Sequence, residues 1–264
     1  FPIWHSRSVC QKTGKNNMKI RYTALLLALA AGSVSAAEIT VSAAASLKEA
    51  FADIAAKYEK QYPQSKVKLN TAGSGALLQQ ALQGAPVDVL AFADQETMNQ
   101  AQVKGVIDKA TRKSFALNSL VIAAPKDRKL TVGRLSDLEG YRFDRIAISN
   151  PASVPVGRYS KAALEKAGIW DNIRSKVITT QNVRQSLDYV ARGEVDAGFV
   201  YNTDAMLMKD KVKVLKTVPT QEPVSYPIAV AASGPQKVEA KRFVQYVLSA
   251  QGQDVLNKYG FKKP

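Results

Sequence analysis

Small and hydroxyl-bearing residues gather at four points where an expected strand gives way to an expected helix. The four segments are Ala44–Ser46, Ala72–Gly75, Asn150–Gly157 and Gln181–Val183. The first N–H groups of a helix have no partner inside the helix and carry partial positive charge. Such junctions lie at the carboxyl edge of a parallel sheet, where open α/β sheets bind their ligands. Converging helix starts therefore predict an anion site that requires no lysine or arginine.

Three side chains in or near these segments also have a purely structural interpretation. Ser46, followed three residues later by Glu49, fits a capping box at the start of a helix. Ser74 lies between two glycines and suits a tight turn, whereas Tyr201 ends an apolar strand, where a tyrosine commonly belongs to the core. Residue types and spacing alone leave both interpretations open at all three positions.

The residue types expected in the mature protein do not favour an enzyme. The single histidine, His5, and the single cysteine, Cys10, lie in the N-terminal segment that we expect the mature protein to lack. Without them the chain has no Cys–His or Ser–His system, no disulfide and no zinc site of the usual kind. The segment Ala72–Ala76 (AGSGA) does not match the G-x-S-x-G motif of hydrolases. We expect no enzyme, with a serine-type hydrolase as a remote alternative, and a flat pH profile of binding between about pH 6 and 8.

The N-terminal region predicts export from the cytoplasm. Residues 18–36 combine two basic residues, the apolar run Ala24–Ala31 and a small-residue cleavage site, as in a secretory signal peptide. A membrane-spanning helix needs about 20 apolar residues, and Gly32 and Ser33 interrupt this run. Residues 1–17 precede a plausible start methionine and are interpreted as an upstream non-native or disordered segment. We expect a soluble periplasmic protein without a lipid anchor, because no cysteine follows the apolar run.

The charge balance is strongly basic but dispersed. The formal net charge of the whole chain is +15, and residues 1–36 hold five basic residues and no acid, which leaves +10 on the remaining 228 residues. Basic and acidic residues alternate, as at Lys57, Glu59 and Lys60, and no aromatic–basic cluster stands out. This pattern favours a solvated basic surface over a nucleic-acid interface. The length is ample for one large domain or two smaller ones.

Strand and helix patterns alternate along almost the whole chain, which predicts an α/β fold with mainly parallel sheets. The expected strands are 39–43, 67–71, 87–92, 119–124, 145–149, 177–180, 196–201, 212–216 and 226–231. The expected helices are 46–61, 76–83, 95–103 with Asp94 as its cap, 158–167, 183–192, 235–248 with Pro235 at its first position, and a short one before Gly260. Two βα series predict two lobes: residues 37–119 and 228–264 form lobe I, and residues 120–227 form lobe II.

Seven segments carry a family signature. They are VSAAASLKEAF (Val41–Phe51), AGSGALLQQ (Ala72–Gln80), GAPVDVLAFAD (Gly84–Asp94), NSLVIAAP (Asn118–Pro125), NPASVPVGRYSKAAL (Asn150–Leu164), NVRQSLDYVARGEVDAGFVYNTDA (Asn182–Ala205) and YPIAVA (Tyr226–Ala231). Through them the chain resembles the periplasmic molybdate-binding proteins of molybdate ABC importers, which are extracytoplasmic solute-binding proteins. The similarity extends over essentially all of Glu38–Lys263.

The resemblance implies a bilobal, periplasmic-binding-protein-like (type II) fold, with two mixed, mainly parallel sheets, flanking helices and a ligand cleft between the lobes. It also implies that hydroxyl and backbone N–H donors hold the oxyanion, with no direct metal ligand. The implied donors are the hydroxyls and the backbone N–H groups of Ser46 and Ser74, the backbone N–H groups of Val156 and Val183, and the phenol of Tyr201. Around Ser74 the family often has a longer run of serines, whereas here Gly73 and Gly75 flank it.

The function that the resemblance implies is capture of molybdate, and of the nearly equal-sized tungstate, for delivery to the membrane permease of an ABC importer. Donors from two lobes must meet one ion, so we expect the bound form to be more closed than the free form. We expect a monomer that binds no nucleic acid and no cofactor other than this ligand. The alternatives are a binding protein for sulfate or phosphate, an iron-binding protein, and the ligand-sensing domain of a transcription regulator.

Overall fold

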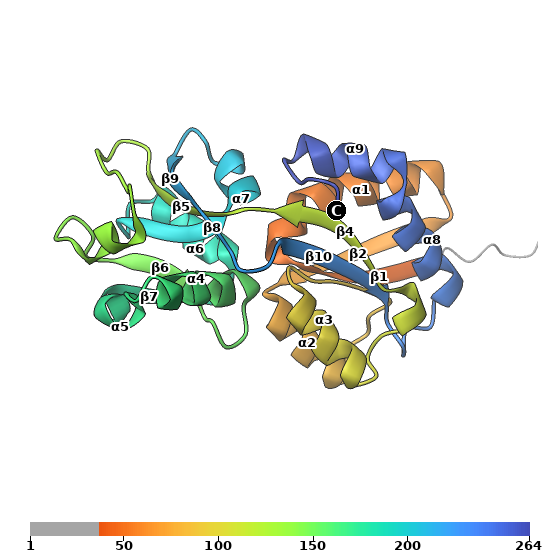
Figure 1. Ribbon diagram of the computed structural model, residues 1–264. Helices are drawn as coiled ribbons and strands as arrows, with labels where there is room; N and C mark the ends of the chain where they lie inside the picture. The colour runs from red at the N-terminus through yellow and green to blue at the C-terminus, as the bar shows by residue number, and fades with distance from the viewer. Residues whose placement is uncertain (1–36) are drawn as a thin grey trace, which may run out of the picture. The chain divides into compact units, whose positions relative to one another are not determined.

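The computed structural model describes residues 37–264, so the expected upstream segment (1–17) and signal peptide (18–36) lie outside the described residues. Two five-stranded sheets organise this part of the chain. The strand order is β2-β1-β3-β10-β4 in the first sheet and β7-β6-β8-β5-β9 in the second. We call the parts built on these sheets lobe I and lobe II (Figure 1). Both sheets are mixed and flanked by helices, which confirms the predicted α/β class. The expectation of mainly parallel sheets is wrong, because each sheet has two parallel and two antiparallel strand pairs.

Lobe I carries helices on both faces of its sheet. Its strands are β1 (Ala37–Ala44), β2 (Ser65–Ala72), β3 (Val89–Ala91), β4 (Lys113–Asn118) and β10 (Val224–Val230). Its helices are η1 (Ala45–Leu47) and η2 (Lys109–Thr111), both 3-10 helices, and α1 (Lys48–Gln61), α2 (Ser74–Leu82), α3 (Gln95–Val103), α8 (Lys237–Leu248) and α9 (Ala250–Lys258). In Figure 1, α2 and α3 lie on one side of the sheet, and α1, α8 and α9 lie on the other.

Lobe II repeats this plan. Its strands are β5 (Leu120–Pro125), β6 (Ile146–Ser149), β7 (Val177–Thr180), β8 (Ala197–Tyr201) and β9 (Val212–Val218). Its helices are η3 (Leu135–Glu139), η4 (Arg174–Lys176), α4 (Pro155–Lys166), α5 (Trp170–Ile173), α6 (Val183–Ala191) and α7 (Asn202–Leu207). The central strands β5, β6 and β8 are buried along their whole length, as expected for strands covered on both faces.

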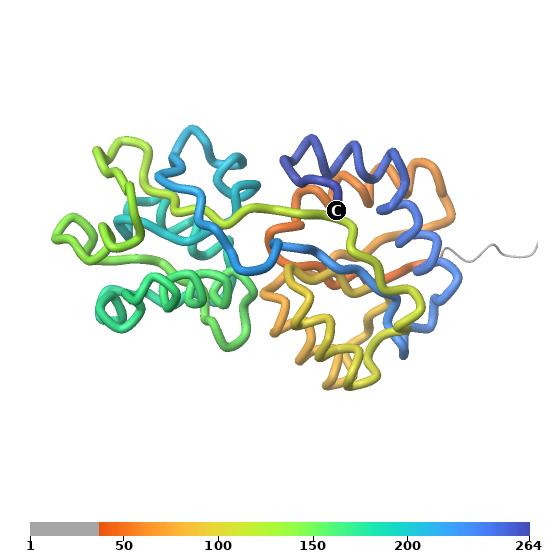
Figure 2. The backbone as a smooth tube through the Cα atoms, viewed as in Figure 1, coloured from red at the N-terminus to blue at the C-terminus, as the bar shows by residue number. Residues whose placement is uncertain are grey.

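The chain passes between the two sheets twice, at Ser119 and at residues 219–223 (Figure 2). The sequence prediction places the second boundary at residue 228, and this is wrong. Residue 228 falls inside β10, whose first residues already pair with lobe I, Val224 with Asn118. The prediction also misses β4, because this edge strand is only partly buried and lacks a continuous apolar run.

Helix starts decide which N–H groups are exposed at the sheet edges. Asp94 caps α3 as predicted, since its side chain accepts from the Thr97 N–H over 3.1 Å. Helix α4 begins at Pro155, three residues before the predicted start, with proline at a position that it favours. The prediction that Pro235 starts α8 is wrong, because the Gln236 N–H donates to Asp88 and holds this segment outside the helix. Within residues 37–264, no helix combines the length and apolarity that a bilayer crossing requires.

Candidate functional site

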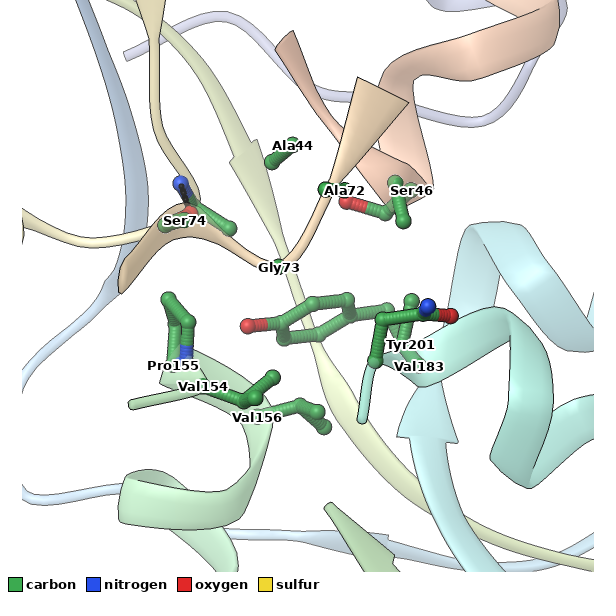
Figure 3. Close-up of a pocket in the computed structure, with 13 residues that line it drawn as sticks. Ala44, Ser46, Ala72, Gly73, Ser74, Val154, Pro155, Val156, Val183 and Tyr201 are labelled. Atoms are coloured by element: carbon green, nitrogen blue, oxygen red, sulfur yellow. Dashed lines mark hydrogen bonds between the residues drawn. The ribbon is translucent and has the colours of Figure 1, made fainter. Parts of the chain in front are cut away.

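One small pocket is lined by the ends of elements from both lobes. Lobe I contributes the ends of β1 and β2 and the starts of η1 and α2, and lobe II contributes the starts of α4 and α6 and the end of β8. All five residues implied by the resemblance line it: Ser46, Ser74, Val156, Val183 and Tyr201. Figure 3 shows the Tyr201 ring between Gly73 on one side and Val154–Val156 on the other. Residues that are more than 150 positions apart in the chain thus meet at one point.

Ser46 is held by a hydrogen-bonded chain of side chains rather than by a capping box. It lies inside η1, its side chain caps no helix, and its Oγ is 2.9 Å from the hydroxyl of Tyr226. The Asn118 side-chain amide donates to that hydroxyl over 3.2 Å. The Tyr226 proton is then available for Ser46 Oγ, which leaves the Ser46 proton free to donate into the pocket.

Ser74 is the first residue of α2 and is buried, with 1% of its surface exposed. Its Oγ accepts a hydrogen bond from the Ala93 N–H over 3.1 Å. A serine hydroxyl has one proton to donate in addition to its acceptor sites. The interaction with Ala93 therefore fixes the position of the oxygen and leaves the proton for a ligand.

Tyr201 presents a buried hydroxyl that has no hydrogen-bond partner among residues 37–264. The residue ends β8, and 1% of its surface is exposed. Burial raises the pKa of its phenol well above the ordinary value, and the neighbouring Tyr226 raises it further. The phenol is therefore neutral and can donate. A buried polar group without a partner is costly, so this hydroxyl marks a place where a ligand acceptor fits.

Two valines supply backbone donors at helix starts. Pro155 is the first residue of α4 and has no N–H, so Val156 carries the first N–H of this helix. Val183 is the first residue of α6. The side chain of Asn182 accepts hydrogen bonds from the N–H groups of residues 184 and 185. The N–H of Val183 is therefore left for the pocket. Neither N–H has an acceptor inside its helix.

The two arginines near the pocket are committed to carboxylates. In α4, Arg158 donates to Asp94 of lobe I from Nε over 3.0 Å and from Nη2 over 2.5 Å. In α6, Arg184 Nη2 donates over 2.6 Å to Glu49 of lobe I. Neither arginine lines the pocket. The donors that face the pocket are therefore uncharged, and the two ion pairs join the lobes beside it.

Asp204 is fully buried and forms an ion pair with Arg184, whose side chain is partly exposed. Its Oδ1 lies 2.9 Å from Arg184 Nε without hydrogen-bond alignment, and its Oδ2 accepts from the Tyr201 N–H over 3.2 Å. Burial raises the pKa of this carboxyl to about 6, although Arg184 opposes the shift. The expectation of a flat pH profile of binding between about pH 6 and 8 did not take this aspartate into account, because its burial is a property of the tertiary structure.

The pocket is small. The centre of a water-sized sphere can occupy about 10 Å³ of it, close to the lower limit of roughly 10–15 Å³ for holding one water molecule. Sites for drug-sized ligands commonly measure about 300 Å³ or more. In this arrangement of the lobes the pocket therefore has room for little more than a water-sized group, far below the size of a site for a drug-sized ligand.

Sequence reasoning missed the residues that support the donors. Tyr226 was assigned only to an apolar strand, and neither Asn118 nor Arg184 was given a role, although all three lie in the signature segments. Their contacts join residues that are far apart in the chain, as between Ser46 and Tyr226. No local pattern signals such contacts. Asp94 was expected only as a helix cap, and its ion pair with Arg158 is an additional role.

Comparisons with known proteins give one family. A model described as bacterial extracellular solute-binding protein matches residues 39–262. The chain is 37% identical over 230 residues to the molybdate-binding protein ModA of Escherichia coli (strain K12), covering 85% of this chain and 88% of the relative. The solved structure of the Azotobacter vinelandii periplasmic molybdate-binding protein is similar with a TM-score of 0.76, at 22% identity over 86% of this chain and 99% of that one.

The same fold occurs in proteins with a different ligand in their names. The sulfate-binding protein SubI of Mycobacterium tuberculosis H37Rv is similar with a TM-score of 0.76, at 17% identity over 86% of this chain and 87% of that one. Both structural likenesses fall below 25% identity and therefore establish the fold alone.

Proposed function

Because the chain belongs to the bacterial extracellular solute-binding protein family, we propose that it captures molybdate, and also tungstate, outside the cytoplasm. It then delivers the ion to the membrane permease of an ABC importer. The family model and the E. coli relative confirm the resemblance that the seven sequence segments indicate. The step to this ligand and this partner is supported by the names of the relatives and by the chemistry of the pocket.

The observation that carries the proposal is a pocket lined by uncharged donors from both lobes. The Tyr201 hydroxyl has no partner among the described residues, and the Ser46 and Ser74 hydroxyls keep a proton to donate. Val156 and Val183 add the free N–H groups of two helix starts. A tetrahedral oxyanion offers four acceptor oxygens around one central atom. A small ligand that offers acceptors only matches this donor set.

At the upper end of their range, the donor energies are sufficient for tight binding. Each hydrogen bond to a charged group contributes about 1.5–3 kcal/mol, and each helix start adds about 0.3–1 kcal/mol. Five such donors supply roughly 8–15 kcal/mol before the costs of association and of closing the lobes. A micromolar dissociation constant requires about 8 kcal/mol net. Neutral donors also form no tight ion pair with the anion, which favours its release to the permease.

The same donor set argues for a binding protein and against catalysis. A nucleophilic serine requires a base within hydrogen-bond reach. Ser46 Oγ contacts the Tyr226 hydroxyl, whose pKa burial raises well above the ordinary value, and Ser74 Oγ contacts the Ala93 N–H. Neither partner takes up a proton near neutral pH. The proposal therefore includes no reaction, no cofactor beyond the anion and no nucleic acid, and it assigns the protein to the periplasm as a soluble monomer.

Calorimetric titration with molybdate, tungstate, sulfate and phosphate tests the proposal. We expect submicromolar binding of molybdate and tungstate, weaker binding of the smaller sulfate, and weaker binding of phosphate, which carries a proton that meets donors. Sulfate that bound as tightly as molybdate would make the protein a sulfate-binding protein of the same fold. Absence of binding by all four anions would remove the proposed function.

A further inference from the structure

The start of α2 lies where lobe I comes into backbone contact with lobe II. The Gly75 N–H donates to the Ser153 carbonyl oxygen over 3.0 Å. A methyl group built on Gly75 would lie 2.3 Å from that oxygen and 3.0 Å from the Ser153 carbonyl carbon. A methyl group on Gly73 would lie 3.0 Å from the Gln181 carbonyl oxygen. The segment around Ser74 is therefore inserted between two loops of lobe II, and it fits there because residue 75 has no side chain.

Neither side can relieve this overlap by a rotamer change, because the atoms of Ser153 involved are backbone atoms. The loop that carries them is tied to its own lobe. The N–H groups of Ser153 and Val154 donate to the Asn150 carbonyl over 3.2 and 2.9 Å, and the Asn150 N–H donates to Thr180 over 2.8 Å. Relief needs a displacement of about 1 Å, the difference between 2.3 Å and ordinary contact at about 3.4 Å.

The conformation of residue 75 does not itself require glycine. Gly75 is not among the glycines with positive φ, and it is the second residue of α2, where alanine is a better helix former. The reason for a glycine at this position is therefore the neighbouring lobe rather than the local backbone.

We infer that Gly75 sets how far the lobes close, and thereby the affinity for the anion. The inference rests on the proposed function, because it takes closure around an oxyanion as the binding step. Gly75 follows the donor Ser74 directly, and Ser153 lies three residues before the donor Val156. A gap of about 1 Å at this contact would stretch hydrogen bonds to one lobe or the other beyond their usual range of about 2.7–3.2 Å.

The test is Gly75→Ala, with Gly133→Ala as the matched control. Gly133 also lacks positive φ, lies in an exposed loop of lobe II, and a methyl group there would have its nearest neighbour at 3.5 Å. Three quantities are measured on each protein: molybdate affinity by calorimetry, stability to urea without ligand, and radius of gyration by small-angle X-ray scattering with and without molybdate.

For Gly75→Ala we expect affinity to fall by roughly 10- to 100-fold, the loss of one or two hydrogen bonds to an anion. Its ligand-free stability should equal or exceed that of the wild type, and its contraction on adding molybdate should be smaller. Unchanged affinity, or a loss of affinity that parallels a loss of ligand-free stability, would overturn the inference.

The two proposals fail in different ways. If the wild type and Gly133→Ala bind none of the four anions, the proposed function falls. The role of Gly75 in closure is then tested by X-ray scattering of the ligand-free proteins. A larger radius of gyration in Gly75→Ala than in Gly133→Ala supports that role. Equal radii in that case overturn it.

Discussion

Two helix starts in this protein use a glycine in the same way, with different consequences. A side chain at Gly75 of lobe I would meet the Ser153 carbonyl oxygen of lobe II at 2.3 Å, and one at Gly157 of lobe II would meet the Ser149 carbonyl oxygen of the same lobe at 2.0 Å. The contact at Gly157 is present whenever lobe II is folded, whereas the contact at Gly75 requires closed lobes. The same missing side chain thus supports folding in one place and ligand capture in the other.

The comparison extends to the polar contacts around the pocket. Asp204 lies beside Arg184 and Tyr201 of its own lobe, whereas Arg158 reaches Asp94 of lobe I. Contacts within a lobe contribute to the free energy of unfolding of the ligand-free protein. Contacts between lobes contribute to the free energy of closure. Substitutions in the two groups should therefore separate unfolding from binding.

The largest effect within a lobe is expected at Asp204, through the pH dependence of stability. Its pKa is raised to about 6 by burial, so the folded state holds its proton more tightly than the unfolded state, where the pKa is about 3.9. The stability contributed by this proton is fully present below about pH 4 and is lost as the pH rises through about 6. Relative to Asp204→Asn, the wild type should lose about 2–3 kcal/mol between pH 4 and 7.

Urea unfolding of the wild type and Asp204→Asn at pH 4, 5, 6 and 7 measures this difference. The change in stability with pH depends only on the difference in bound protons between the folded and unfolded states. A pH-independent cost of removing the partner of Arg184 shifts the Asp204→Asn curve as a whole and does not alter its slope. Stability curves that run parallel over this range would contradict a raised pKa at Asp204.

Gly157→Ala should lower the free energy of unfolding of the ligand-free protein by about 1–3 kcal/mol, the usual cost of overpacking. The added methyl group meets the backbone at Ser149 in its own lobe, and opening the lobes does not relieve it. Urea unfolding without ligand checks the value. If Gly157→Ala is as stable as the wild type while Gly75→Ala is not, the assignment of the two glycines is reversed.

Ser46→Ala and Ser74→Ala should each weaken molybdate binding by about 1–3 kcal/mol, because each removes a hydroxyl donor to an anion. Neither should reduce ligand-free stability by much more than the loss of one neutral hydrogen bond. Calorimetry on both variants, with the exposed Ser175→Ala as control, measures the effect. Wild-type affinity in both would remove these serines from the site.

Tyr201→Phe should produce the smallest effect on binding, about 1 kcal/mol, because the backbone donors remain. It should not lower ligand-free stability, since the hydroxyl that it removes is buried without a partner among the described residues. Calorimetry tests the expected loss of affinity, and urea unfolding of the same preparation tests the expected ligand-free stability. A clear loss of ligand-free stability would show that this hydroxyl has a structural partner.

Local patterns were sufficient where one element decides its own structure. The spacing of Phe51, Ile54 and Tyr58 predicted a helix that buries one face, and α1 does so. Strand and helix alternation predicted an α/β fold, and the strands near 39–43 and 196–201 are β1 and β8. The edge strand β4 was missed because partial burial leaves no continuous apolar run for sequence analysis to detect.

The candidate site could be predicted only in part. Helix starts at sheet edges predicted the kind of site, and the resemblance supplied the five residues that the structure places around one pocket. The alternative for Ser46, a capping box with Glu49, is wrong, because Ser46 contacts Tyr226 and Glu49 pairs with Arg184 of the other lobe. Both contacts depend on where the other elements lie.

The amino-acid order by itself determined the alternation of strands and helices, the small and uncharged residues at their junctions, and the absence of histidine and cysteine from residues 37–264, because these depend on residue type and short spacing. Tertiary structure alone decided that donors from two lobes meet, that Arg158 and Arg184 are neutralised, and that Gly75 faces a carbonyl of the other lobe. Those features arise from packing between segments that are far apart in the chain, and the local sequence of a segment does not determine which distant segment it contacts.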